Sequence, residues 1–274
     1  MTARLATAPT DAPVATERGL MPLPPPPPSP ALAERLQACN LMLPALLPCA
    51  QPCETLWSHR GHPRLRAAVQ QLRHPLSAHM QMPAFDLAAL AAAEAAEADV
   101  YRQWHRTVQG PLSMADVQRF VSLSTGGDGA LRSGPVWIRA HDGRAQLPMV
   151  PALQGAARWD ELLRQRAAPD PAEGLRSAVQ LLALANNAHA FADGNGRLGR
   201  ALFNFCLHRA GLPQACFIPL KVLTVLSRGG YEVRLREAEL YGRWEGLYAW
   251  HCTAIELYAW LGQQPAMPDR NEDV

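Results

Sequence analysis

Two segments with helical periodicity flank a glycine-containing loop, and this arrangement constrains the fold more than any other feature of the chain. Residues 173–188 and 198–209 carry apolar side chains at helical spacing, and no proline interrupts either segment. Between them, residues 189–200 read HAFADGNGRLGR. Glycine within a helix costs about 1 kcal/mol relative to alanine, so the loop interrupts the helical pattern. The sequence therefore predicts helix, loop, helix, with His189 at or just beyond the end of the first helix.

The loop carries the residue types that bind phosphates. Gly194 and Gly196 can take positive φ and let the backbone form a concave nest for anions. The following helix begins with unpaired N–H groups and a partial positive charge. Arg197 and Arg200 lie three positions apart, so both guanidinium groups can reach one anion. Asn195 can cap the helix or donate its amide to a phosphate.

Two further residues of the loop add a metal ligand and a base. Asp193 supplies a hard oxygen ligand, and one carboxylate together with substrate phosphates is the usual way in which proteins hold Mg²⁺. His189 is a candidate general base because an unperturbed imidazole has a pKa of about 6.5. The loop therefore predicts a polyphosphate site with Mg²⁺, beside a base that activates an incoming hydroxyl for in-line attack on phosphorus.

Other phosphate and metal motifs fit this segment badly. The chain has no P-loop pattern of glycine, four residues and Gly-Lys-Ser/Thr. An EF-hand that began at Asp193 would need an oxygen ligand where Arg197 stands and glycine where Leu198 stands. A dinucleotide-binding loop follows a strand, whereas the segment before this loop is helical in pattern. A simple turn with solvated arginines is the structural alternative.

The loop and its flanking helices make the sequence resemble Fic-domain proteins. His189, Phe191, Asp193 and the run from Gly194 to Arg200 match the family pattern His-x-Phe-x-(Asp/Glu)-Gly-Asn-Gly-Arg-x-x-Arg at all its fixed positions. Ala190 stands where many members have proline, which should cost some rigidity and little chemistry. The resemblance implies an all-α, mostly helical Fic fold with a short β-hairpin flap. It implies a protein adenylyltransferase, which moves AMP from ATP to a Tyr, Thr or Ser hydroxyl of a target protein.

The resemblance also implies a role for each motif residue. His189 is the general base, Asp193 holds Mg²⁺, and Phe191 points into the core and anchors the loop. The remaining residues bind the nucleotide: Gly194, Asn195 and Gly196 at the α-phosphate, and Arg197 and Arg200 at the β- and γ-phosphates. Relatives that transfer UMP, phosphocholine or phosphate leave the donor open, and a Fic scaffold that only binds is a non-enzymatic alternative.

A second matching region lies upstream, where Asp142-Gly143 separates two extended runs. Asp-Gly between such runs is a strong hairpin signal. The hairpin formed by residues 135–141 and 144–148 resembles the family's flap, which pairs with the backbone of the target by strand addition. An ordinary surface hairpin is the alternative, and His141-Asp142 also imitates part of a phosphohydrolase metal site. The residues expected to position the target are Val136, Trp137, Ile138 and Arg139.

Some family members carry an inhibitory helix with Ser/Thr, three residues, and Glu before Gly or Asn, whose Glu pairs with the second motif arginine. In this chain only Glu173 and Glu245 precede glycine, and the residues four positions earlier are Pro169 and Tyr241. We therefore expect no built-in inhibitor of that kind. Inhibition by a separate antitoxin stays open, as does the absence of any inhibitor.

Composition changes along the chain predict four parts. Residues 1–34 are rich in Thr, Ala and Pro and should be disordered, with polyproline II at 22–30 serving as a linker, a docking site or an export signal. Residues 35–85 should form a helical or irregular extension, 86–262 the Fic domain and 263–274 a flexible tail. Helices are expected at 87–105, 113–123, 220–226, 231–240 and 244–261.

Bulk properties exclude several classes of partner. A net charge of +2 gives no reason to expect nucleic acid, and no apolar run is long enough for a membrane span. Without a secretory signal peptide we expect a cytoplasmic protein, unless another route exports it into a host cell. The six cysteines should then be reduced thiols. Cys49, Cys53, His59 and His62 could imitate a zinc site, although their spacing misses the common patterns.

Overall fold

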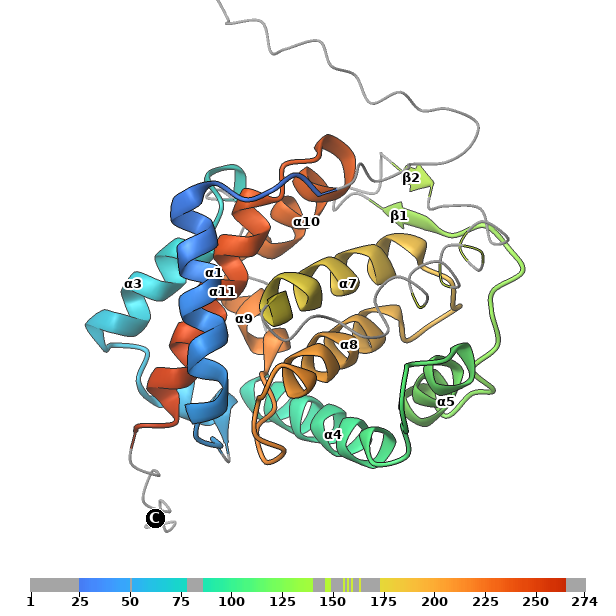
Figure 1. The fold of residues 1–274 in the computed structure, drawn as a ribbon, viewed down its shortest axis with the longest axis horizontal. Helices are drawn as coiled ribbons and strands as arrows, with labels where there is room; N and C mark the ends of the chain where they lie inside the picture. Colours follow the sequence, from blue (N-terminus) through green and yellow to red (C-terminus); the bar gives the residue numbers. More distant parts are fainter. Residues whose placement is uncertain are drawn as a thin grey trace, which may run out of the picture.

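The computed structural model describes residues 25–49, 51–77, 86–139, 146–148, 155, 157, 159, 163 and 173–264. Helices dominate this part of the chain, and they pack in layers around a central pair (Figure 1). The α-helices are α1 (Pro30–Met42), α2 (Pro52–Ser58), α3 (Pro63–Leu72), α4 (Leu87–His105), α5 (Met114–Thr125), α7 (Gly174–Ala188), α8 (Asn195–Arg209), α9 (Leu220–Leu226), α10 (Gly230–Tyr241) and α11 (Glu245–Leu261).

Helices α7 and α8 form the central pair and carry the predicted loop between them. Most side chains of both helices are buried, which explains why their apolar positions spread beyond one narrow stripe. Gly199 lets the two helices approach closely, because a Cβ at this position would lie 2.7 Å from Nδ2 of Asn186. The predicted helix–loop–helix is confirmed, with α8 beginning three residues earlier than expected.

Helices α4 and α5 cover one side of this pair, and polar caps fix where each begins. The Asp86 carboxylate accepts hydrogen bonds from the N–H groups of Ala88, at 2.8 Å, and Ala89. Ser113 and Asp116 form a reciprocal capping box at the start of α5. Trp104 is fully buried between the two helices and α8, with its ring 5.3 Å from that of Phe120. The helices expected at 87–105 and 113–123 are thus confirmed.

The N-terminal layer is more ordered than its composition suggests. Helix α1 packs along α11, where Arg35 forms a bidentate pair with Glu256 at 2.8 Å. Because this helix begins at Pro30, the prediction of disorder up to residue 34 is wrong for residues 30–34. Prolines in the first turn start α1, α2 and α3, since proline has no N–H to lose there and its φ suits a helix. Two short 3-10 helices, Leu43–Ala45 and Pro75–Ser77, complete the layer.

Two short antiparallel strands, β1 (Trp137–Arg139) and β2 (Gln146–Pro148), lie between α5 and α7 in the sequence. Trp137 pairs with Pro148 and Arg139 with Gln146. The predicted turn at Asp142-Gly143 and the His141-Asp142 pair lie outside the described residues. The role of this hairpin as a flap stays a prediction.

Three further sequence expectations concern thiols, metals and membranes. All six cysteines carry free thiols. Within the described residues, no three His, Cys, Asp or Glu side chains gather as metal ligands would. His59 and His62 instead contact backbone groups of their own turn, at Thr55 and Arg64. No helix in the described part of the chain combines the length and the apolar character that crossing a bilayer requires.

Candidate active site

His189 ends α7 in a left-handed conformation, with φ 42° and ψ 49°. Few residues other than glycine adopt this conformation, so the surrounding structure must hold it. The N–H of His189 donates to the carbonyl of Ala185, and its own carbonyl accepts a 2.5 Å hydrogen bond from Nε of Arg132. The backbone N–H of Arg132 donates to the carbonyl of Ala190 at 2.9 Å. Arg132, which the sequence did not single out, thus fixes the turn that presents the imidazole.

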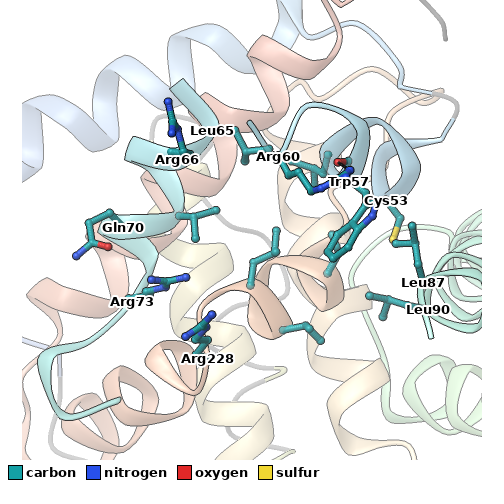
Figure 2. Close-up of a pocket in the computed structure, with 15 residues that line it drawn as sticks. Cys53, Trp57, Arg60, Leu65, Arg66, Gln70, Arg73, Leu87, Leu90 and Arg228 are labelled. Atoms are coloured by element: carbon teal, nitrogen blue, oxygen red, sulfur yellow. Dashed lines mark hydrogen bonds between the residues drawn. The ribbon is translucent and has the colours of Figure 1, made fainter. Parts of the chain in front are cut away.

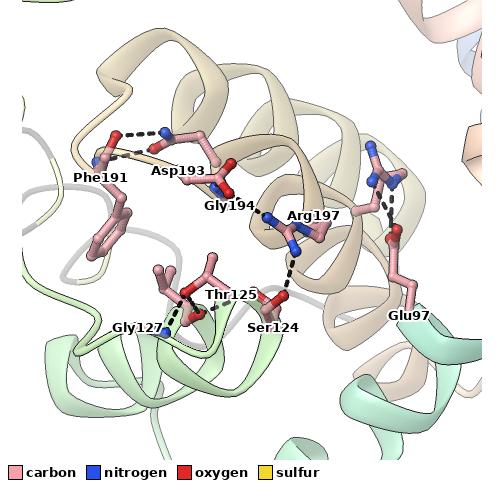
Figure 3. A network of polar contacts seen from close by, with 11 residues as sticks. Glu97, Ser124, Thr125, Gly127, Phe191, Asp193, Gly194 and Arg197 are labelled. Carbon is pink, nitrogen blue, oxygen red and sulfur yellow. Dashed lines mark hydrogen bonds and ion pairs between the residues drawn. The ribbon is translucent and has the colours of Figure 1, made fainter. Parts of the chain in front are cut away.

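The side chain of Asn195 connects the two ends of the loop by hydrogen bonds. Its side-chain oxygen accepts from the N–H of Phe191 at 3.1 Å, and its amide donates to the carbonyl of the same residue at 2.7 Å. Figure 3 shows these paired bonds at the left of the network. Phe191 itself is fully buried against Trp159, which confirms that it anchors the loop. The expectation that the Asn195 side chain caps the helix is wrong, because Gly194 is the N-cap and no side chain caps α8. A contact of the second amide N–H of Asn195 with a phosphate stays a prediction.

The two glycines of the loop act differently. Gly194 has φ 84°, and a Cβ there would lie 2.9 Å from Cγ2 of Thr125, so both its conformation and its space require glycine. Gly196 lies in the first turn of α8 without a positive φ, so the expected positive φ is wrong for this residue. A Cβ on Gly196 would meet only Nη1 of Arg200, at 3.5 Å. Gly196 therefore leaves open space next to the helix N-terminus.

A cavity of about 480 Å³ lies at the N-terminus of α8. It brings together Asp193, Gly194, Gly196, Arg197 and Arg200, five of the residues predicted for metal and nucleotide binding. His189 and Asn195 do not line it. Helices α4, α5 and α9 supply the rest of its wall, with the side chains of Ala93, Ala96, Glu97, Val100, Phe120, Ser124 and Lys221.

Asp193 and Arg197 form a pair at the mouth of this cavity. Arg197 donates to Oδ2 of Asp193 at 2.8 Å and also to the carbonyl of Ser124 (Figure 3). The N–H of Gly194 donates to the other carboxylate oxygen at 2.6 Å. That hydrogen bond, followed by the contact with Arg197, lowers the pKa of Asp193. The Asp193 side chain is 77% exposed, so an ionised carboxylate faces solvent beside the helix N-terminus.

Arg200 is paired with a carboxylate that the sequence did not reveal. Its Nε and Nη2 donate to the two oxygens of Glu97 at 2.8 and 2.7 Å, a bidentate arrangement. Burial opposes the charge on Arg200, but the hydrogen bonds and charge of Glu97 raise its pKa overall. The chain lacks the family's inhibitory sequence pattern, yet Glu97 makes the contact with the second motif arginine that such a pattern would make. No sequence signal marks it, since Ala93 and Ala98 stand at the pattern's other positions.

The environment of His189 favours its neutral form. Burial lowers the pKa of the imidazole, and the positive charges of Arg132 and Arg236 lower it further, while a hydrogen bond to the backbone of Asn186 opposes them. The ring is therefore a proton acceptor at neutral pH. Arg236 comes from α10, so the C-terminal helices contribute to this end of the loop.

Comparisons with known proteins agree with this geometry. Residues 96–207 match the Fic/DOC family, from the middle of α4 to the last turns of α8. No curated protein sequence is similar enough to this chain to count as a match.

Solved structures with a similar fold are distant in sequence. A Fic family protein from Desulfovibrio desulfuricans G20 superimposes with a TM-score of 0.59 at 19% identity, covering 86% of this chain and 75% of that chain. A Fic domain containing signalling protein from Bacteroides thetaiotaomicron VPI-5482 gives 0.52 at 17% identity, covering 85% and 97%. Fic-1 from C. elegans gives 0.51 at 17% identity, covering 83% and 70%. The mostly helical Fic fold expected from the sequence is confirmed.

Proposed function

We propose, from the premise that this chain is a Fic-domain protein, that it transfers AMP from ATP to a Tyr, Thr or Ser hydroxyl of a target protein. One observation carries this assignment. Asp193, Arg197 and Arg200 line a single cavity at the N-terminus of α8, and His189 ends the helix that precedes the same loop.

The cavity suits the phosphates of a nucleotide. The first N–H groups of α8 have no partner within the helix, and Gly196 leaves open space in the same helix turn. Arg197, Arg200 and Lys221 add positive charge to the same cavity. Both arginines are engaged by carboxylates in this structure, so bound phosphates would take the place of Asp193 and Glu97 as their partners.

Asp193 fits a role as ligand to Mg²⁺. Its carboxylate is ionised at neutral pH because its pKa is lowered, and it is exposed at the cavity mouth where phosphate oxygens would lie. When bound there, Mg²⁺ would neutralise charge on the phosphates and orient them.

His189 is the residue to which we assign the proton transfer. The neutral imidazole accepts the proton of the target hydroxyl, and the hydroxyl oxygen forms a bond to the α-phosphorus of ATP. The bond from that phosphorus to the bridging oxygen breaks, and pyrophosphate leaves with its charge stabilised by Arg197 and Arg200. We assign the docking of the target to the strand formed by Val136, Trp137, Ile138 and Arg139, which would add a strand of the target to the hairpin. A separate antitoxin as inhibitor stays a proposal.

The test is mass spectrometry of cell-lysate proteins, and of the protein itself, after incubation with ATP and Mg²⁺. An added AMP on a hydroxyl side chain, absent with a His189→Ala variant, is the expected result. Parallel incubations with UTP or CDP-choline identify a different donor by the adduct mass. Tight nucleotide binding without any adduct, in every incubation, would show a binding module instead of a transferase.

A further inference from the structure

A second cavity, of about 370 Å³, lies between α2, α3, the first turn of α4 and α9, away from the motif loop. This volume is in the range of small-molecule sites. Its inner wall carries mostly apolar side chains, drawn in Figure 2, and half of them are buried. The wall is formed by Cys53, Leu56, Trp57, Leu65, Val69, Leu87, Leu90, Val222, Val225 and Leu226.

Two arginines lie together at one side of this apolar space. Arg73 follows α3 and Arg228 follows α9, and Figure 2 shows their guanidinium groups side by side. The Nε atoms of both residues are buried without a hydrogen-bond partner. Burial, and then the positive charge of Arg228, lowers the pKa of Arg73, as expected for two neighbouring cations. None of the described residues that line the cavity carries a carboxylate.

The backbone conformation of Arg228 is a further observation that points to a ligand between the two arginines. Arg228 has φ 50°, a left-handed conformation that is strained for a residue with a side chain. Two glycines, Gly229 and Gly230, follow it directly. A glycine at position 228 would remove both the strain and the repulsion from Arg73. An anion that binds both guanidinium groups would explain why arginine occupies this position.

We infer that this cavity binds a small amphiphile with an anionic head, a phosphate or a carboxylate, on an alkyl tail. The head lies between Arg73 and Arg228 and satisfies their unpaired Nε groups. The tail lies along the apolar wall formed by α2, α4 and α9. Phosphate and carboxylate each present two oxygens that a planar guanidinium group can bind in a bidentate way, so the alkyl tail and the paired arginines define the ligand class.

The experiment is calorimetric titration of the full chain with octyl phosphate and octanoate, below the concentrations at which either forms micelles. Octanol supplies the tail alone, and inorganic phosphate supplies the head alone. We expect one of the two amphiphiles to bind at a stoichiometry of one, at least about tenfold more tightly than octanol or phosphate, since each charged hydrogen bond contributes about tenfold. Equal binding of octanol would overturn the inference.

Three variants locate the site. Arg73→Gln and Arg228→Gln should each weaken amphiphile binding by about tenfold, by loss of a charged contact. Arg64→Gln is the matched control, because Arg64 lies on the same helix, is exposed and does not line the cavity. Val225→Phe fills the apolar space and should abolish binding. Thermal melting reports whether each variant is folded.

Other occupants give different results. A second copy of the chain in the cavity would appear as a concentration-dependent dimer that Val225→Phe dissociates, and it would overturn the inference. Unchanged amphiphile binding in both arginine variants would overturn it as well. Because none of these residues lines the motif cavity, the result is independent of whether the protein transfers AMP.

Discussion

The two cavities hold their arginines in opposite ways. In the motif cavity, Arg197 and Arg200 each face a carboxylate, from Asp193 and Glu97. In the apolar cavity, Arg73 and Arg228 face each other, and no lining residue among those described is acidic. An anion that enters the first cavity must compete with internal carboxylates, whereas an anion that enters the second meets unpaired donors. The first arrangement suits an exchangeable substrate, and the second suits a ligand that stays bound.

The two cavities also share structural elements. Helix α4 contributes Leu90 to the apolar cavity and Glu97 to the motif cavity. On α9, Val222 and Lys221 are neighbours in sequence and line different cavities. Each helix therefore has one apolar face toward the N-terminal layer and one polar position toward the motif. The predictions below separate the two sites, beginning with the largest expected effect.

His189→Ala should reduce transfer by about 10²–10⁴-fold, the usual contribution of a general base. ATP affinity should change little, because His189 does not line the motif cavity. The measurement is the initial rate of transfer of labelled AMP, together with calorimetric ATP binding. Arg73→Gln, from the other cavity, should transfer at the wild-type rate. A His189→Ala protein with unchanged rate would remove this residue as the base.

Asn195→Ala should destabilise the motif loop and lower the free energy of unfolding by about 2–6 kcal/mol. The buried N–H and carbonyl of Phe191 would both lose their partner, at about 1–3 kcal/mol each. Asn195→Asp keeps the acceptor and removes the donor, so its loss should be intermediate. Urea unfolding at neutral pH measures both variants. A loss below 1 kcal/mol for both would show that the loop is held by Arg132 and Phe191 alone, a threshold of about the size of one ordinary hydrogen bond.

Much of this fold was predictable because its signals are local. Neighbouring residues carry the signals that start and shape these helices: the polar caps at Asp86 and Ser113, and the apolar spacing of α7, α9, α10 and α11. The helices begin and end within a few residues of the predicted positions. The motif residues that line the cavity were predictable for the same reason, since residues 193–200 belong to one loop and one helix turn.

The parts that escaped prediction depend on contacts between distant segments. Glu97 and Arg200 are separated by 103 positions, and no pattern around Glu97 marks the pair. Lys221 reaches the cavity only because α9 packs against α4. Helix α1 begins inside a proline-rich segment because Leu32, Leu36 and Cys39 are buried in the core that α11 shares, which composition alone does not reveal.

Glu97→Gln would make the motif cavity resemble the apolar one by removing a carboxylate. Arg200 would then be free to bind a phosphate, and ATP should bind about tenfold more tightly, the size of one charged hydrogen bond. Glu94→Gln is the matched control on the same helix. Burial, and then the charge of Glu97, raises the pKa of Glu94 to about 8, so its carboxyl is mostly neutral at pH 7. Weaker ATP binding in Glu97→Gln would mean that Glu97 positions Arg200 for the nucleotide.

Gln70→Glu is the reverse change, since it adds a carboxylate to the apolar cavity close to Arg73. Gln70 is exposed and precedes Arg73 by three positions at the end of α3. An exposed ion pair contributes about 0.2–1 kcal/mol, so amphiphile binding should weaken by at most about fivefold. Calorimetry with octyl phosphate measures this effect, and Gln71→Glu, next to it and outside the lining, is the control. Tighter binding in Gln70→Glu would contradict a site for anions.

The pH dependence of transfer should show the smallest effect in the neutral range. Only the neutral imidazole of His189 accepts a proton, and burial and the charges of Arg132 and Arg236 lower its pKa below the ordinary value. A lowered pKa extends the neutral form to lower pH, so the rate should vary by less than about twofold between pH 6.5 and 8 and fall only on the acid side. Arg236→Gln removes one positive charge, which should raise this pKa and move the acid limb to higher pH. Arg236 also pairs with the buried Glu239, so thermal melting must accompany the pH–rate profile. An acid limb centred above pH 6.5 in the wild type would mean that the group that titrates is not His189. An acid limb that does not move in a folded Arg236→Gln protein would mean the same.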